Sequence, residues 1–364
     1  MVTTHHKVDR FFLWIVILMV STGFFLFASA SMSLLVKEQT TLVSILSIQL
    51  FSIVLGFIFL IIASKIPNQF WKKYSLYLFI GSILLTLLVF IPGIGVEYGG
   101  ALRWLKIGPI TIQPAEFLKV GFIIYFASFL TSLKHKIHSP KYGILQILLI
   151  LLIIGLILLK QPDTDTFVVI IISALSMFIV AEGKWLYTLG FITLGSVGLW
   201  ILTIMQPYIK ERLLTFLDPA RDMLGSGWQI KQSLIAIGSG ELYGRGFGQS
   251  IQKFTNLPEP IGDSIFAVIA EEFGFIGSVI LIICFLMFAT RGLQIAKQTN
   301  DKFSRLLVVG IVILVVSQSF LNIGAMLGIF PLTGMPLLFI SKGGSALLAT
   351  LFLMGIVLNI SKKV

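Results

Sequence analysis

The sequence predicts an all-α, polytopic integral membrane protein with about ten transmembrane helices and one large extracytoplasmic loop. Hydrophobic residues make up 57% of the 364 residues and charged residues only 12%, whereas soluble domains carry roughly 25% charged residues. The apolar residues also form successive runs near the length of a membrane helix, which needs roughly 17–25 residues. No separate soluble domain is expected, so residues 1–364 are interpreted as a single transmembrane domain.

The first apolar run follows a short polar and basic start. It is too long for the apolar core of a signal peptide, so we expect a retained first span. Nine further runs follow, of which the fifth and sixth are short. The ten predicted spans are Phe11–Leu35, Leu42–Ala63, Tyr74–Ile94, Phe117–Leu133, Ile144–Leu159, Phe167–Val180, Leu186–Met205, Ser264–Ala289, Phe303–Ile329 and Met335–Ile360.

Lys and Arg residues predict the orientation of these spans. Ten spans put both termini on one side, and the short connections on that side carry 15 Lys and Arg residues, against 5 in the short connections on the other side. Because basic residues accumulate in cytoplasmic loops, we expect both termini to be cytoplasmic. The extracytoplasmic segments are then Gly95–Glu116, Lys160–Asp165 and the large loop 206–263.

Charge distribution and missing motifs argue against several classes of function. The net charge of +11 would suit a nucleic-acid ligand, but the basic residues gather in short loops, as topology determinants do. We therefore expect no nucleic-acid partner. The chain has no Walker loop, dinucleotide fingerprint or HExxH motif. The histidines His5, His6, His135 and His138 fall in predicted cytoplasmic segments, which argues against a His-rich zinc site.

The end of the large loop carries the first candidate functional residues. The loop is rich in glycine between Gly238 and Gly248, and glycine lets the backbone fold tightly or approach a ligand closely. The stretch LPEPIGDSIFAVIAEEFGFIG then joins the loop to an apolar helix, with Glu259 and Asp263 at the boundary. Asp263 is a candidate general base or cation ligand. The alternative is that its side chain caps the helix N-terminus.

Two more carboxylates, Glu271 and Glu272, follow inside that predicted helix. Eight or nine residues of helix rise by about 12–13 Å, so we expect both acids to lie below the membrane surface. Ionisable groups at that depth are costly, and they are usually functional or paired.

Two further clusters lie at predicted outer helix ends. Glu116 and Lys119 are three residues apart and can pair on one helix face. Such a pair is an interfacial ion pair of little energetic value, unless it lies near Asp263 and belongs to a site. Asp163 and Asp165 lie two residues apart in a tight turn. They are candidates to bind a divalent cation or, alternatively, to cap the sixth span.

The last predicted span contains the sequence SKGGS, with Lys342 at its second position. The Gly-Gly pair predicts either a helix break that lines a cavity or close helix packing through small residues. In the preceding span, Gln318 and Asn322 are four residues apart. We expect these two side chains to form interhelical hydrogen bonds rather than to bind a ligand.

These motifs, in this order and over most of the chain, resemble the SEDS family of polytopic peptidoglycan polymerases. The matching segments are RW at Arg103–Trp104, QPAEFLK at Gln113–Lys119, QPDTDT at Gln161–Thr166, GWQIKQSLIAIGSGELYGRGFGQSIQK at Gly227–Lys253, LPEPIGDSIFAVIAEEFG at Leu257–Gly274 and PLLFISKGGSALLA at Pro336–Ala349.

The resemblance implies a glycosyltransferase of the bacterial inner membrane that polymerises lipid II, the undecaprenyl-diphosphate-linked muropeptide. It implies that Asp263 is the essential acid, that Glu116 and Lys119 are the Glu and Lys of the PxE-F-x-K motif, and that Asp163 is the acid of the QPD motif. The segment before LPE is closer to the division members than to the elongation members. The implied partners are a class B penicillin-binding protein transpeptidase, other divisome proteins and membrane lipids.

The sequence also departs from the family pattern. Asp165 stands where the family usually has Gly, and Gly262 and Ser264 replace the Thr and Phe that usually flank the essential acid. Lys342 and Ala346 replace a Tyr and a Ser. None of these departures removes a matched carboxylate.

The mechanistic hypothesis is that Asp263 deprotonates the 4-hydroxyl of the acceptor sugar, which attacks the anomeric carbon of the lipid-diphosphate donor. General-base help is typically worth about 10²–10⁴-fold. Lys119 or Arg103 would stabilise the diphosphate, and Asp163 would help to hold Mg²⁺ or Mn²⁺. The residues expected to bind substrate are Arg103, Asp163, Glu259 and Lys342.

Three alternatives stay open at this point. A lipid II flippase would also use polar residues and broken helices, an elongation-type polymerase would share the chemistry, and a scaffold would tolerate changes at Asp263. The carboxylates gather at the predicted outer face, which favours chemistry there over transport.

Overall fold

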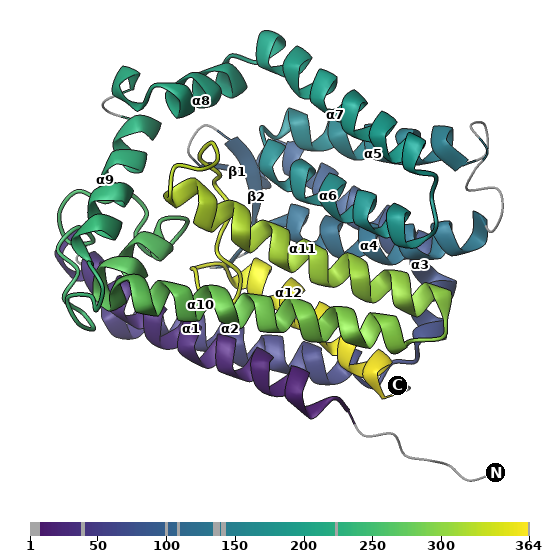
Figure 1. Ribbon diagram of the computed structural model, residues 1–364, viewed down its shortest axis with the longest axis horizontal. Coiled ribbons are helices and arrows are strands. Elements are labelled where there is room, and N and C mark those ends of the chain that lie inside the picture. The colour runs from purple at the N-terminus through teal and green to yellow at the C-terminus, as the bar shows by residue number, and fades with distance from the viewer. Residues whose placement is uncertain are drawn as a thin grey trace.

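The computed structural model describes residues 8–37, 41–98, 101–107, 110–133, 139, 143–222 and 225–362. Helices dominate these residues and most run alongside one another (Figure 1), in agreement with the all-α class. The described helices are α1 (Arg10–Lys37), α2 (Leu42–Ala63), α3 (Asn68–Leu87), α4 (Pro114–Leu133), α5 (Leu145–Lys160), α6 (Thr164–Val180), α7 (Trp185–Met205), α8 (Pro207–Leu217), α9 (Ser226–Ser239), α10 (Ile265–Gln298), α11 (Lys302–Met326) and α12 (Gly344–Ser361), with short 3₁₀ turns η1 (Leu88–Phe90) and η4 (Pro219–Arg221).

Each of the ten predicted spans overlaps a helix in the described part of the chain, although several bounds differ by six residues or more. Eight helices are long and apolar enough to cross a membrane, namely α1, α2, α3, α4, α7, α10, α11 and α12. The fifth and sixth predicted spans correspond to α5 and α6, which are shorter apolar helices. The chain is therefore a multi-pass membrane protein. Its four histidines lie outside the described residues, so the structure does not test where they are.

Two predicted extracytoplasmic segments contain secondary structure that the sequence did not predict. The segment after η1 forms a three-stranded antiparallel sheet of β1 (Gly95–Tyr98), β2 (Ala101–Ile107) and β3 (Ile110–Ile112), in that order. The large loop 206–263 contains α8 and α9. Proline starts α8, where its missing N–H costs nothing. The term loop end is used below for the end of the bundle that carries this sheet, α8 and α9.

The last predicted span is wrong at its start. Met335 was expected to begin the helix, but α12 begins at Gly344, and residues 327–343, between α11 and α12, are irregular. Phe339 has φ of 69° there, a backbone conformation that does not continue a right-handed helix. The break that the Gly-Gly pair predicted is therefore confirmed, and it leaves an irregular segment between α11 and α12.

The core of the bundle is formed by α11 and α12. Over an 18-residue apolar stretch of each helix, 83% of the residues are buried in α12 and 72% in α11, whereas only 11% are buried in α7. Helix α12 packs on α2, and α11 packs on α4, α6 and α10. Exposed apolar side chains on the outer helices, among them Trp14, Trp185 and Trp200, suit a surface that faces lipid tails.

The two ends of the described chain meet at the end of the bundle opposite the loop end. Figure 1 shows the start of α1 and the end of α12 on the same side of the molecule, and the Asp9 backbone N–H donates a hydrogen bond of 3.1 Å to Ser361 Oγ. Arg291, near the end of α10, pairs with the Asp9 carboxylate at 2.6 Å. An even number of spans requires this arrangement.

Helix α10 is broken near its start. Gly274 has φ of 65° and ψ of −164° within the stretch assigned to α10, a conformation that glycine adopts without strain. The break separates a short leading helix, residues 265–273, from the long apolar part that follows. Glu271 and Glu272 lie in the leading helix. The expectation of one continuous helix was therefore wrong. The break follows Glu271 and Glu272, so their expected depth below the membrane surface stays a prediction.

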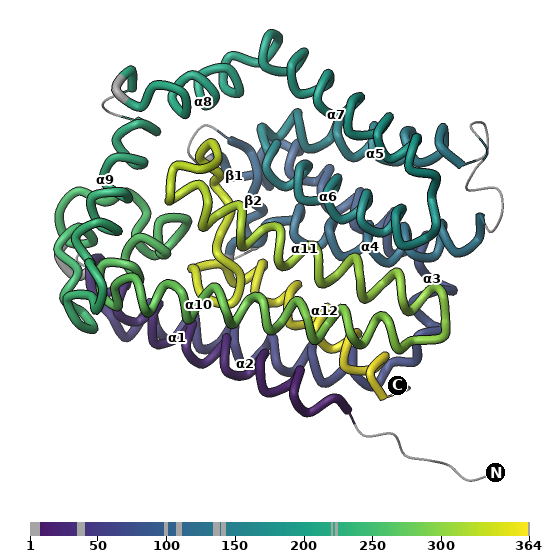
Figure 2. Tube along the Cα trace, viewed as in Figure 1, coloured from purple at the N-terminus to yellow at the C-terminus, as the bar shows by residue number. Residues whose placement is uncertain are grey.

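The glycine-rich part of the large loop packs on this break. A Cβ at Gly240 would collide with the Ala270 carbonyl oxygen, and one at Gly244 would collide with the Glu272 carbonyl oxygen. Backbone N–H groups of Arg245 and Gly246 donate to the Glu271 and Glu272 carbonyls at 3.0 and 2.9 Å. The glycines therefore allow the backbone of the large loop to pack closely against the backbone of α10. Figure 2 shows this loop folded at the loop end beside α1 and α10.

Candidate active site

The backbone around Asp263 is held by three separate parts of the fold. From α11, Asn322 Nδ2 donates to the Asp263 carbonyl oxygen at 2.8 Å and to the Met335 carbonyl at 2.8 Å. From the irregular segment, the Lys342 N–H donates to the Ile261 carbonyl at 2.8 Å. From α9, Gln229 Nε2 donates to Ser264 Oγ at 2.9 Å. Asn322 thus forms structural hydrogen bonds, but its acceptors lie in two non-helical segments, so the prediction of interhelical hydrogen bonds was wrong for this residue.

The Asp263 side chain does not cap α10. Asp263 lies two residues before the first residue of α10, whose N-cap residue is Ser264, and no side-chain capping hydrogen bond is present there. Oδ1 of Asp263 is instead buried without a hydrogen-bond partner. The pKa of this carboxyl is raised to about 7, chiefly by burial and also by the Glu259 carboxylate, against the opposing effects of Gln229 and Arg212. A carboxyl that titrates near neutrality is suited to general-base chemistry.

Arg103 lies on β2 and is bonded to the turn that precedes α6. Its Nε donates to the Gln161 carbonyl at 3.1 Å, and its Nη2 donates to the Pro162 carbonyl. Gln161 is fixed in turn, because its side-chain amide donates to the Thr86 carbonyl at 3.0 Å. Two backbone carbonyls therefore orient the guanidinium group and leave its charge without a carboxylate partner among the contacts of the described residues.

A second arginine, Arg212 of α8, lies close to Arg103 near Gly334. Its Nη1 lies 2.8 Å from Asp165 Oδ2, and its guanidinium lies 4.4 Å from the ring centroid of Tyr208, one helical turn earlier. A Cβ added to Gly334 would be 3.8 Å from Arg103 Nη1 and 3.8 Å from Arg212 Nη2. The two guanidinium groups therefore converge on one point of the irregular segment. Paired arginines suit a phosphate or diphosphate ligand.

Asp163 caps α6, as one of its two interpretations predicted. Its Oδ1 accepts from the Thr166 N–H at 3.4 Å, and the residue is 2% exposed. Its Oδ2 is buried without a partner, which leaves one free oxygen of the kind that Mg²⁺ or Mn²⁺ prefers. Asp165 is engaged by Arg212. In the described ranges, no group of three His, Cys, Asp or Glu residues could hold a metal ion.

Glu116 and Lys119 form a buried ion pair. Lys119 Nζ lies 2.8 Å from Glu116 Oε1, and the two side chains are 2% and 4% exposed. Lys119 also donates to Gln318 Oε1 at 2.6 Å, and Gln318 Nε2 donates to the Pro336 carbonyl at 3.2 Å. This chain of contacts joins α4 to α11 and to the irregular segment. Lys119 is occupied, so this conformation does not leave it free to bind a diphosphate.

The other two substrate-binding candidates are more accessible. Glu259 and Lys342 are both exposed. The Glu259 carbonyl accepts from the Gly262 N–H at 3.0 Å, in a turn where Glu259 itself has φ of 42°. Glu259 therefore lies in the loop that ends at Asp263. Lys342 lies in the irregular segment, whose backbone is bonded to that loop at Ile261.

Glu271 and Glu272 belong to a separate buried polar cluster. Glu271 accepts from Ser250 Oγ at 2.5 Å and from the backbone N–H groups of Ile251 and Gln252 at 3.0 and 3.2 Å. Glu272 lies 2.6 Å from Lys253 Nζ. Ser29 Oγ of α1 also donates to the Glu272 carboxylate, at 2.6 Å from Oε2. These carboxylates are paired, and they bind the large loop to α1 and α10.

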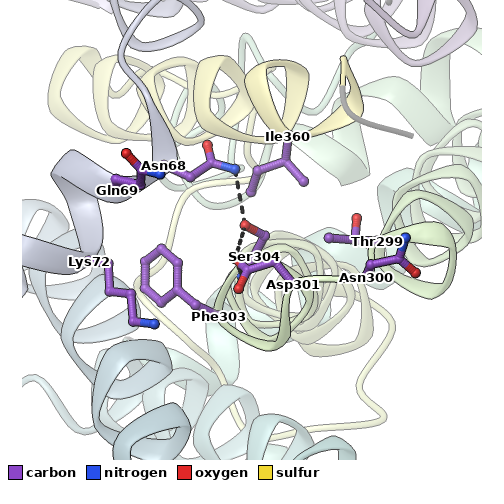
Figure 3. Close-up of a pocket in the computed structure, with 9 residues that line it drawn as sticks. All are labelled: Asn68, Gln69, Lys72, Thr299, Asn300, Asp301, Phe303, Ser304 and Ile360. Carbon is purple, nitrogen blue, oxygen red and sulfur yellow. Dashed lines mark hydrogen bonds between the residues drawn. The ribbon is translucent and has the colours of Figure 1, made fainter. Parts of the chain in front are cut away.

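A cavity of about 420 Å³ lies at the opposite end of the bundle. Figure 3 shows the Asn68 amide donating to Ser304 within it. Because it lies beside the start of α3 and the start of α11, it is remote from Asp263 and is no part of the candidate active site. It is lined by Asn68, Gln69, Lys72, Thr299, Asn300, Asp301, Phe303, Ser304 and Ile360.

Sequence reasoning missed Arg212, Tyr208 and Gln229, which all come from helices inside the large loop. Each lies near Asp263 or Arg103 only after the loop has folded. A weak signal was present, because Tyr208 and Arg212 are four residues apart, the spacing of neighbours on one helix face. That spacing could have identified them as a pair but not placed them at the site.

A family model described as a cell cycle protein, FtsW/RodA/SpoVE, matches residues 9–364. The chain belongs to this family. The FtsW/RodA/SpoVE match covers every element described above, including the Asp263 loop and the irregular segment before α12. The predicted SEDS membership, which rested on six short motifs, is thereby confirmed.

Individual relatives agree with this membership. A probable peptidoglycan glycosyltransferase FtsW of Geobacter metallireducens is 38% identical over 310 residues, which is 85% of this chain and 83% of the relative. The stage V sporulation protein E of Bacillus subtilis is 37% identical over 308 residues, 85% of this chain and 84% of the relative. A chain from a structure described as "Structural coordination of polymerization and crosslinking by a peptidoglycan synthase complex" has a TM-score of 0.81 and 26% identity, with 98% of each chain covered.

Proposed function

We propose that this chain is a peptidoglycan glycosyltransferase that polymerises lipid II into glycan strands in the bacterial inner membrane. The observation that carries the proposal is Asp263, whose buried, unpartnered carboxyl oxygen has a pKa near 7 and lies beside two converging arginines. Similarity to a probable peptidoglycan glycosyltransferase supports the same reaction. A base next to an anion site is the arrangement that attack by a sugar hydroxyl on a diphosphate-linked sugar needs.

In this mechanism Asp263 takes the proton of the acceptor 4-hydroxyl as the hydroxyl oxygen bonds to the anomeric carbon of the donor. The bond from that carbon to the diphosphate oxygen breaks, and Arg103 and Arg212 stabilise the negative charge that develops on the diphosphate. The sequence analysis gave this role to Lys119, but we assign it to Arg212, because Lys119 is held by Glu116 and Gln318. A single base and no covalent intermediate imply inversion at the anomeric carbon, by analogy with glycosidases.

The rate of polymerisation is expected to rise with pH and to level off above about 7. A carboxyl whose pKa is raised to about 7 is protonated below that pH and cannot accept the proton of the hydroxyl. The charged groups facing it are Glu259 and Arg212. The measurement is kcat/KM for lipid II between about pH 5.5 and 9, in the wild type and in Asp263→Asn. A wild-type rate that is independent of pH throughout this range would contradict the role of Asp263.

Polymerisation is also expected to depend on Mg²⁺ or Mn²⁺. A divalent cation would neutralise diphosphate charge, and Asp163, with its unpartnered Oδ2, is the residue we assign to hold it together with the substrate. Mg²⁺ commonly binds through one or two carboxylates plus substrate phosphates. A chelator should stop polymer formation, and added Mg²⁺ or Mn²⁺ should restore it. Full activity in excess chelator would show that polymerisation does not require a divalent cation.

The division role and the partner are part of the same proposal. Similarity to a chain of a peptidoglycan synthase complex supports a class B penicillin-binding protein as partner. The FtsW relative favours septal synthesis, whereas the sporulation relative is nearly as similar. Both termini are proposed to be cytoplasmic, from the excess of Lys and Arg on their side of the sequence. The loop end with Asp263 is then extracytoplasmic.

The test of the function is glycan formation from labelled lipid II by the full-length protein, purified together with its class B partner. We expect polymer with the wild type. The strongest alternative, a lipid II flippase, predicts labelled lipid II that crosses the bilayer of proteoliposomes without forming polymer. That outcome would replace the polymerase assignment.

A further inference from the structure

Asp165 joins three parts of the fold that are far apart in the sequence. It lies in the first turn of α6, and its Oδ2 is 2.8 Å from Arg212 Nη1 of α8. The same oxygen accepts a hydrogen bond of 3.2 Å from the Gly334 N–H of the irregular segment. The Asp165 and Arg212 side chains are only 12% and 20% exposed. An ion pair this enclosed is screened less than a surface pair.

Helix α8 has few other attachments to the bundle. Its backbone contacts are chiefly with its sequence neighbours α7, η4 and α9, and Thr215 is the buried residue of this helix. Figures 1 and 2 show α7, α8 and α9 forming an arch that leads away from the bundle and back to it. A helix with so little buried surface is held in place weakly by packing. The pair with Asp165 is the principal polar connection between α8 and the start of α6.

The position of Arg212 matters for the reaction because of what surrounds it. Its charge acts on Asp263, and its Nη2 faces the same point at Gly334 as Arg103 Nη1. Arg103 is held by two backbone carbonyls, whereas Arg212 is held by Asp165 and by stacking on Tyr208. A guanidinium has five N–H donors. Asp165 therefore engages one edge and leaves other donors free for an anion.

We propose that Asp165 is a positioning residue for substrate binding: it holds Arg212 beside Asp263 and Arg103, where both guanidinium groups bind the diphosphate of a lipid-linked substrate. This inference rests on the proposed function for the identity of the substrate. Asp165 itself does not contact the substrate. Its effect on the reaction passes through Arg212, so removing Arg212 should make Asp165 irrelevant.

The experiment is a double-mutant cycle with Asp165→Asn, Arg212→Ala and the combined variant, in the full-length protein with its partner. The readouts are the Kd for fluorescent lipid II, and KM and kcat for polymerisation. Asp165→Asn should raise Kd and KM about tenfold, as expected for one lost charge-assisted hydrogen bond, with kcat changed less than about threefold. In the Arg212→Ala background, Asp165→Asn should change Kd less than about twofold.

Two further variants separate the effect of the Asp165 carboxylate from other effects of substitution. Asp165→Glu restores a carboxylate and should recover much of the affinity, and it also serves if Asp165→Asn does not fold. Glu211→Gln is the matched control, because it removes an exposed carboxylate on α8 next to Arg212, and its Kd should match the wild type.

The proposal is overturned if Asp165→Asn weakens lipid II binding equally with and without Arg212, or if it leaves Kd unchanged. An equal loss in both backgrounds would identify a purely structural role. Failure of the proposed function looks different. A wild type that binds lipid II but makes no polymer would reject the polymerase, while the Kd values of the cycle would still decide the role of Asp165.

Discussion

Replacement of Asp263 by Asn is expected to reduce glycan polymerisation at least as much as loss of a general base does, by about 10²–10⁴-fold. Asn has nearly the same shape but cannot accept the proton of the attacking hydroxyl. The backbone carbonyl that Asn322 contacts is unchanged, so the loop should keep its conformation. The measurement is the initial rate of polymer formation from lipid II at a pH above 7, where the wild-type carboxyl is ionised.

The stability of Asp263→Asn provides the control for this prediction. Burial raises the folded-state pKa of Asp263 to about 7 from 3.8, so the folded state binds the proton more tightly than the unfolded state. The cost of ionising this buried group is therefore present in full above pH 7 and disappears below the unfolded pKa. A neutral Asn avoids this cost. The variant should melt at the same temperature as the wild type or higher at pH 8, and a lower melting temperature would point to a structural role.

Replacement of Lys253 by Met should destabilise the protein by about 3–5 kcal/mol, the usual cost of leaving a buried charge without its partner. Lys253 is fully buried, and its Nζ lies 2.6 Å from Glu272 and 3.0 Å from the Ser29 carbonyl. Without it, Glu272 retains hydroxyl donation from Ser29 but no cation. The measurement is thermal unfolding of the detergent-solubilised protein, together with protease cleavage within the large loop.

The double variant Lys253→Met with Glu272→Gln tests whether the ion pair is the cause. It removes both charges, so it should recover a large part of the lost stability. Lys231→Met is the matched control, because Lys231 is an exposed lysine on α9 in the same loop, and it should unfold like the wild type. A double variant less stable than Lys253→Met alone would show that Lys253 acts by other means than pairing with Glu272.

Apolar length predicted the helices of the bundle well, because hydrophobic runs are a local property of the sequence. The start of α12 and the break at Gly274 show the limit of that method. Gly343 and Gly344 together signalled a break, which the structure has. A single glycine within an apolar run is tolerated in many helices at a cost of about 1 kcal/mol, so Gly274 gave no comparable signal. Its break depends on the loop that packs against it.

The position of Asp263 at the start of α10 could be predicted from the sequence, but the cationic neighbours of this candidate site could be predicted only in part. Asp263 stood at the boundary of a polar loop and an apolar helix, and Arg103 stood in an outer segment. Lys119 was a reasonable diphosphate ligand until its contact with Gln318, 199 residues away in sequence, was known. Arg212 reaches the site through Asp165, 47 residues away. Contacts over such separations depend on tertiary packing, which a single sequence does not reveal.

The most direct test of the central claim is polymer formation from labelled lipid II in proteoliposomes, with wild type and Asp263→Asn side by side and the class B partner present in both. Movement of lipid II across the bilayer is recorded in the same samples. The account predicts glycan strands from the wild type, none above background from the variant, and equal amounts of folded protein in both. Comparable polymer from Asp263→Asn would contradict it.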